Sequence, residues 1–183
     1  LLTVACLYLP KGAAAPTATS SDKDVEKFAE KKRFLDALDG FDNRDDVHVM
    51  HRSFELGPTL GPEDTGSVEQ HIAGKYGISV EQARANEDRI GAQAAEMGLP
   101  YQTAGRDYGN SFDMHRLLHL AAEHGKQNQL LDALYHANFG DSQRLFGNDE
   151  RLAEIAIGIG LDEATVRRTI DDKTAYADDV RRD

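Results

Sequence analysis

The sequence predicts a mixed α/β fold in which helices dominate, and three observations support this prediction. Residues 47–56, VHVMHRSFEL, are rich in β-branched and aromatic side chains and alternate in character, as a strand requires. The apolar run at residues 1–9 is a second candidate strand. From Gly66 onward every segment has helical spacing and is bounded by Gly, Asn, Asp or Ser. The length of 183 residues suits one domain of ordinary size with an insertion.

The first 21 residues contain no acidic residue and differ in composition from the rest of the chain. We expect a first β-strand that ends at Cys6, followed by a linker rich in Pro, Ala, Thr and Ser at residues 10–21. The alternative is the remnant of an export signal, with TVAC as an incomplete lipid-attachment site. The chain has no initiator Met and no basic segment before the apolar run, which indicates a start that is cut or altered. We therefore expect a cytoplasmic protein, and an exported one if residues 1–21 are a signal remnant.

The next elements follow from capping residues and periodicity. Ser21 is a candidate N-cap for a helix that Gly40 ends. In the strand at residues 47–56, Val47, Val49, His51 and Ser53 share one face. Further helices are expected at residues 67–76, 80–97, 111–124, 127–139, 149–159 and 162–170, with a last piece from residue 174.

A single strand leaves its backbone hydrogen-bonding groups without partners. Residues 1–9 therefore pair with residues 46–56, or partner strands are missing from the chain. The alternative is an all-helical domain with one hairpin.

Composition excludes several classes of function. The formal net charge of −11 argues against nucleic acid and against an anionic membrane surface as partners. Cys6 is the only cysteine, so no disulfide within the chain holds the fold, and the usual structural zinc sites are not expected. No apolar run reaches the roughly 20 residues that a membrane span needs. We expect no cofactor.

Two histidines lie one helical turn apart in NSFDMHRLLHLAAEHGKQ, residues 110–127. On a helix, His115 and His119 lie together at one border of a wide apolar arc, and Arg116 lies on the polar side. The spacing allows both imidazoles to bind one metal ion, but no third ligand follows at helical spacing, and the central Glu of HExxH is absent. We therefore expect a structural or cleft-lining pair rather than metal ligands.

Several ordered segments resemble the DsbA-family oxidoreductases of the FrnE type. They are KKRFLDAL (31–38), VHVMHRSFELGP (47–58), KYGISVEQARA (75–85), AAEMGL (94–99), NSFDMHRLLHLAAEHGKQNQLLDALYHANF (110–139) and GLDEATVRRTIDDKTAYADDV (160–180). The resemblance covers roughly residues 31–183. It implies a thioredoxin-like fold with an all-helical inserted domain. The implied division is a partial thioredoxin-like portion at residues 1–66, a helical insertion at residues 67–170, and the start of the return to the first portion at residues 171–183.

The resemblance also implies thiol–disulfide exchange at a CPWC-like motif on the N-terminus of the first helix, where a helix dipole favours the thiolate. A cis-proline loop normally faces that motif. In this chain VAC, residues 4–6, resembles the start of the motif, but CLYL stands in place of CPWC, so Leu9 replaces the second cysteine. None of the five prolines is placed to supply the cis-proline. Activity is therefore expected to be impaired.

The resemblance makes Cys6 the candidate nucleophile, with a small thiol or a protein thiol or disulfide as the substrate. It gives candidate substrate-binding residues at the start of the helix that borders the cleft: Asn110, Ser111, His115 and Arg116. One alternative is a glutathione-dependent enzyme similar to 2-hydroxychromene-2-carboxylate isomerase, with Ser20 or Ser21 as its serine. Another is a non-catalytic helical binding module. The sequence does not determine the oligomeric state.

Overall fold

The computed structural model describes residues 2–10, 24–55 and 57–183. A two-stranded antiparallel sheet begins the fold, with β1 (Leu2–Pro10) paired to β2 (Val47–Glu55). Cα partners run from Leu2 opposite Glu55 to Pro10 opposite Val47. The predicted pairing of the two strands is therefore confirmed. The predicted end of the first strand at Cys6 is wrong, because the ladder with β2 continues to Pro10.

Helix α1 (Asp24–Asp39) lies between the two strands in the chain and ends at Gly40, where the sequence predicted a stop. A short 3₁₀ helix, η1 (Arg44–Asp46), then leads directly into β2. On α1, the ammonium group of Lys31 is buried and forms an ion pair with Asp132 of α5 (Gln127–Gly140). This contact holds α1 against the helical part of the molecule.

The remaining helices follow β2 and agree with the predicted segments to within a few residues. They are α2 (Val68–Tyr76), α3 (Val80–Glu96), α4 (Phe112–Glu123), α5, α6 (Asp149–Gly158), α7 (Glu163–Asp171) and α8 (Ala177–Arg182). Ser79 and Gln82 form a reciprocal capping box at the start of α3. Gly77 ends α2 in the left-handed region, at φ 64°. In the described part of the chain, no helix has the length and apolar character needed to cross a membrane.

One pairing was not predicted. β3 (Gly66–Ser67) and β4 (Asp107–Tyr108) form a second antiparallel ladder in the region where the sequence predicted helices alone. Each strand has two residues, which is too short to show a period in the sequence. The ladder joins the strand before α2 to the strand after α3, so the two ends of this helical segment lie next to each other.

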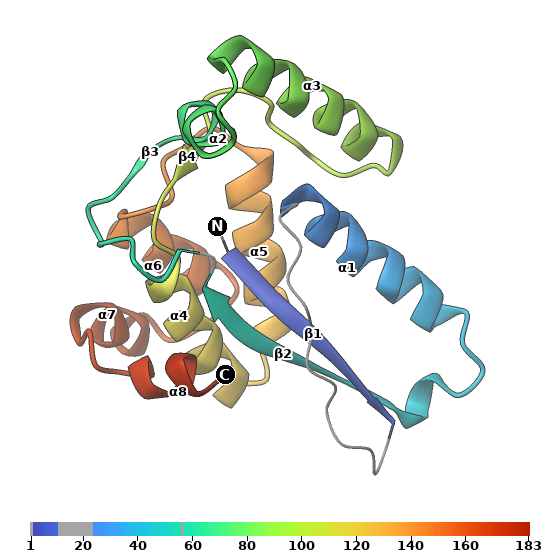
Figure 1. Cartoon of the computed structure of the whole chain (residues 1–183). Helices are drawn as coiled ribbons and strands as arrows, with labels where there is room; N and C mark the ends of the chain where they lie inside the picture. The colour runs from blue at the N-terminus through green and yellow to red at the C-terminus, as the bar shows by residue number, and fades with distance from the viewer. Residues whose placement is uncertain (1, 11–23, 56) are drawn as a thin grey trace.

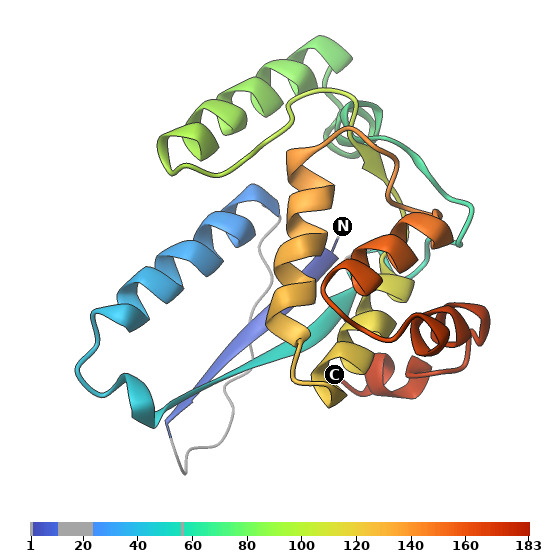
Figure 2. The same cartoon turned by 180° about the vertical axis from the view of Figure 1, so that it is seen from behind.

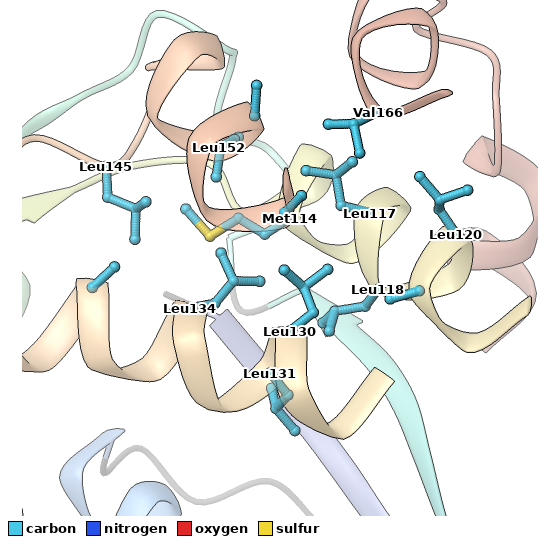
Figure 3. Close-up of a cluster of buried hydrophobic side chains, with 14 of the residues drawn as sticks. Met114, Leu117, Leu118, Leu120, Leu130, Leu131, Leu134, Leu145, Leu152 and Val166 are labelled. Carbon is cyan, nitrogen blue, oxygen red and sulfur yellow. The ribbon is translucent and has the colours of Figure 1, made fainter. Parts of the chain in front are cut away.

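The hydrophobic core lies among α4, α5, α6 and α7 (Figure 3). Its largest apolar members are fully or almost fully buried: Met114, Leu117, Leu120, Leu130, Leu131, Leu134, Phe139, Leu145, Phe146 and Val166. Helices α4 and α5 lie behind the strand pair in Figure 1 and in front of it in Figure 2. The strand pair is therefore covered on one face by helices that come from the centre of the helical segment.

Helix α3 is at the edge of the molecule (Figure 1) and contributes few buried residues. Its main polar anchor is Glu87, which is buried and paired with the guanidinium of Arg106. The hydroxyl of Tyr101 donates to Glu87 Oε2 at 2.8 Å, and the Arg106 guanidinium lies 4.6 Å from the centroid of the Tyr101 ring. Pairing offsets part of the cost of burying the two charges, while Nη1 of Arg106 is buried without a hydrogen-bond partner among the described residues.

We propose that residues 67–170 form one compact unit, since α4 to α7 share a single core. Limited proteolysis is expected to leave this unit intact while it cuts within residues 10–21, the linker that the sequence predicts. Mass spectrometry of the fragments is the measurement. Early cleavage near Gly125 or Gly140, which lie at helix ends inside the unit, would contradict the proposal.

Candidate functional site

The backbone of the single cysteine lies in β1. The Cα atom of Cys6 is the register partner of the Cα atom of His51 in β2. His51 is 7% exposed, and its Nε2 hydrogen-bonds to the side-chain oxygen of Asn128 on α5. Burial lowers the pKa of His51, and the hydrogen bond with Asn128 opposes this only partly. The residue opposite Cys6 is therefore a buried imidazole that is neutral at pH 7.

A second group of polar residues lies two positions further along β2. The Oγ atom of Ser53 lies 3.1 Å from Nε2 of His119, a residue of α4. The Asp183 carboxylate, which directly follows α8, lies 3.3 Å from the same nitrogen. It also accepts hydrogen bonds from the backbone N–H of Ser53 at 2.8 Å and from Nη1 of Arg52 at 2.7 Å. Three elements, β2, α4 and α8, therefore meet at one carboxylate.

This arrangement is not a catalytic relay of serine, histidine and aspartate. In such a relay the serine and the aspartate contact different ring nitrogens, so that the histidine passes a proton from one side to the other. Here Ser53 and Asp183 both contact Nε2 of His119. The geometry instead suits recognition of a carboxylate.

His115 lies deeper than its predicted place at the border of the apolar arc. It is 0% exposed, and neither ring nitrogen has a hydrogen-bond partner of ordinary geometry among the described residues. Burial lowers the pKa of His115 to about 3, and the neighbouring His119 ring acts in the same direction, whereas Asp183 and the Phe54 backbone oppose it. His115 is therefore a neutral imidazole inside the protein. The predicted border position is wrong because β2 packs over this side of α4.

Arg116 was predicted on the polar side of its helix, and this is also wrong: it is 1% exposed. Its guanidinium donates to four backbone carbonyls at the end of α7 and in the turn that follows. These are the carbonyls of Thr169 (2.6 Å), Ile170 (3.3 Å), Asp172 (2.8 Å) and Ala175 (3.1 Å). Its Nε atom donates to Asp113 at 2.9 Å. The face of α4 that carries Arg116 was predicted to be exposed, but it is buried because α7 and α8 pack on it.

Asn110 and Ser111 precede α4. The side-chain oxygen of Asn110 accepts a hydrogen bond from the Phe112 N–H at 2.6 Å, and its amide donates to the Leu60 carbonyl. Ser111 is 5% exposed, and its carbonyl accepts the His115 N–H at 3.1 Å. The four candidate substrate-binding residues thus contact three different parts of the molecule. Their role in substrate binding remains a prediction.

Four residues of the site were not predicted from the sequence: His51, Arg52, Ser53 and Asp183. The alternation of the strand at residues 47–56 already placed His51 and Ser53 on one face, and this face is the buried one. Nothing local in the sequence indicated that Asp183 would meet them. Ser20 and Ser21 lie outside the described residues. Within residues 2–10, 24–55 and 57–183 no three His, Cys, Asp or Glu side chains gather as a metal site would require, and the metal prediction remains a prediction.

The chain order of β1, α1 and β2, followed by a helical block, is the order that the resemblance to thioredoxin-like folds with a helical insertion implied. The model of the DSBA-like thioredoxin domain matches residues 23–183, which is most of the chain. The chain therefore belongs to the DsbA-like family of thiol–disulfide oxidoreductases. A search among curated proteins gave no match.

The structure is similar to the crystal structure of a probable DsbA oxidoreductase from Streptomyces coelicolor. The TM-score is 0.82 and the sequences are 52% identical. The match covers 85% of this chain and 67% of that chain. The similarity confirms the predicted DsbA-like thioredoxin fold with its large helical content.

Proposed function

We propose that this chain is a DsbA-like thiol–disulfide oxidoreductase of the FrnE type that acts on a small thiol or on protein thiols and disulfides. The observation that supports it best is the 52% identity to the Streptomyces protein over 85% of the chain. In the proposed reaction the thiolate of Cys6 attacks one sulfur of a substrate disulfide. A mixed disulfide forms, and the other substrate sulfur leaves as a thiolate, which takes a proton from water.

We also propose that this chain is impaired in the second step, the release of the mixed disulfide. A second thiol in the same motif normally performs this step, and Cys6 is the only cysteine of the chain. The strand conformation adds a further obstacle. Residues three apart in a strand are separated by about 10 Å, whereas the Cα atoms of a disulfide lie about 4.4–6.8 Å apart. Cys6 and position 9 both lie in β1, so this backbone does not present a CxxC pair in bridging geometry.

The environment of β2 also supports impairment. A positive charge or a helix N-terminus near a cysteine stabilises its thiolate. The residue in register with Cys6 is His51, which burial holds neutral. Cys6 itself belongs to a strand rather than to the first turn of a helix. Neither a helix N-terminus nor a charged imidazole at position 51 is therefore available to stabilise the thiolate.

The test is reduction of insulin by dithiothreitol, with thioredoxin as the positive control. The unmodified chain and Cys6→Ser are both expected to match the uncatalysed rate. A second thiol in the same molecule would attack the mixed disulfide at an effective concentration that reaches on the order of 10⁵ M in well-oriented cases. This chain lacks that thiol, so release of the mixed disulfide is expected to be slow. Leu9→Cys is expected to remain inactive as well, because the strand keeps the two thiols apart. Turnover by the unmodified chain that disappears in Cys6→Ser would contradict the proposed impairment.

A non-catalytic helical module is the second candidate. The favouring observation is the incomplete redox motif: Cys6 is the only cysteine of the chain, and it lies in a strand. Retention of Cys6-dependent mixed disulfides with glutathione, observed by mass spectrometry, would favour the oxidoreductase. Complete resistance of Cys6 in the folded chain would favour the module.

A further inference from the structure

We infer that Arg52, Ser53 and His119 form a carboxylate-binding site at the outer edge of β2, which Asp183 fills from within the chain. The ligand class is a carboxylate at the end of a peptide, which exchanges with the side chain of Asp183. The inference concerns a binding site apart from the proposed thiol chemistry, because none of the three residues is a thiol.

Three different kinds of polar group, all of a type that binds carboxylates, surround the Asp183 side chain. Arg52 Nη1 donates to Oδ1 of Asp183 at 2.7 Å, and the Ser53 backbone N–H donates to Oδ2 at 2.8 Å. His119 Nε2 lies 3.3 Å from Oδ2. A guanidinium, a backbone N–H and an imidazole therefore converge on the two oxygens. Charge-assisted bonds of this kind are roughly twice as strong as neutral ones, and protein grooves that capture a peptide C-terminus also use backbone N–H groups.

The backbone donor is available because, among the described residues, β2 pairs with β1 alone. In an antiparallel pair the N–H groups of successive residues point alternately toward the partner strand and away from it. The N–H of Ser53 donates to Asp183 and so belongs to the edge that β1 does not cover. An edge N–H without a partner would favour pairing with another chain. A carboxylate satisfies it instead.

The site is dry at one end and open at the other. The side chain of Asp183 is only 4% exposed, while those of Arg52 and His119 are 44% and 20% exposed. A ligand carboxylate thus has an approach from the Arg52 side.

Exchange of the two carboxylates requires the side chain of Asp183 to leave a place in which it is only 4% exposed. Asp183 directly follows the six-residue helix α8, and its N–H makes one backbone hydrogen bond, to the Asp179 carbonyl. The internal carboxylate competes with a ligand at an effective concentration that is in the millimolar range for short tethers. An external carboxylate is therefore expected to bind weakly to the unmodified chain and more tightly when Asp183 is absent.

The experiment measures binding of acetate, and of a tripeptide with a free C-terminus, by the shift in melting temperature and by NMR of the His119 ring. Acetamide and the C-terminally amidated tripeptide are the matched neutral probes. Asp183→Ala is expected to bind the two carboxylates at least ten-fold more tightly than the unmodified chain. Adding Arg52→Met to this variant is expected to abolish the gain. Asp178→Ala is the control, because Asp178 is 91% exposed and pairs with Arg181 of the same helix.

Acetate binding without peptide binding would restrict the site to small carboxylates and contradict the peptide part of the inference. Equal effects of acetate and acetamide, equal affinities of Asp183→Ala and the unmodified chain, or a gain that survives Arg52→Met would each overturn the site. If Asp183→Ala is too unstable to purify, Asp183→Asn, which keeps the shape of the side chain, is titrated in the same way. A Cys6→Ser background keeps the result independent of the proposed thiol chemistry.

Discussion

Replacement of Arg116 by methionine is expected to lower the free energy of unfolding by about 3–5 kcal/mol, the usual cost of breaking a buried charged network. The guanidinium is 1% exposed and bonds four carbonyls at the end of α7 and in the following turn. Methionine retains the aliphatic stem but leaves these acceptors without a donor in a dry environment. An unsatisfied buried polar group costs roughly 1–3 kcal/mol.

The effect should be strongest at the junction of α7 and α8. The last carbonyls of a helix have no partners within the helix, and a cation at this end also interacts favourably with the helix dipole. Arg116 performs both functions for α7. Amide hydrogen exchange in residues 174–182 is therefore expected to accelerate in Arg116→Met, since this segment is held to α4 through the same guanidinium.

Urea unfolding followed by circular dichroism measures the change in stability. Arg167→Met is the matched control, because Arg167 pairs with Glu150 and Glu163 on the exposed surface. Exposed ion pairs contribute little, so this variant is expected to unfold close to the unmodified chain. Arg116→Lys is expected to recover only part of the loss, since an ammonium cannot reach carbonyls in several directions at once. Equal stabilities of Arg116→Met and Arg167→Met would contradict the role of Arg116.

The second large effect is a loss of stability in acid that depends on His115. Its pKa is about 3 in the folded protein, because burial disfavours the charged ring, against about 6.5 in an unfolded chain. Between these values the unfolded chain binds a proton that the folded protein does not. The contribution of the neutral ring is thus fully present above pH 6.5 and is lost as the pH falls toward 3. The slope from this single group is at most about 1.4 kcal/mol per pH unit.

The measurement is the free energy of unfolding at a series of pH values between 4 and 7. His115→Leu is expected to reduce the slope of the free energy of unfolding against pH by up to the amount that one proton contributes. The stability at pH 7 should change little, since an apolar side chain replaces a buried polar group without partners of ordinary geometry. Met114→Leu is the control, because it alters a buried neighbour on α4 and removes no titrating group. Parallel pH curves for the unmodified chain and His115→Leu would show that His115 does not titrate as its burial requires.

The sequence by itself determined the elements whose signals are local. The ends of the helices expected at residues 67–76 and 80–97 were predicted closely, because a cap such as Ser79 or Gly77 is a contact within four residues. The long helices followed from apolar spacing, and β2 followed from its alternation. The family resemblance placed these elements in the DsbA-like fold, which the comparisons confirm. The alternation also placed His51 and Ser53 on the same side of β2, although it did not show that this side is the covered one.

Only the tertiary structure decided which polar residues became internal. Periodicity on one helix assigned Arg116 to solvent, because nothing within α4 shows that the end of α7, more than fifty residues later, brings its carbonyls to that side. The same limit applies to His115, which β2 buries, and to Asp183, which reaches Ser53 across 130 residues. The extent of β1 past Cys6 was likewise decided by pairing with β2. Local propensity is a short-range property, whereas burial of a polar side chain depends on partners that only the fold brings near.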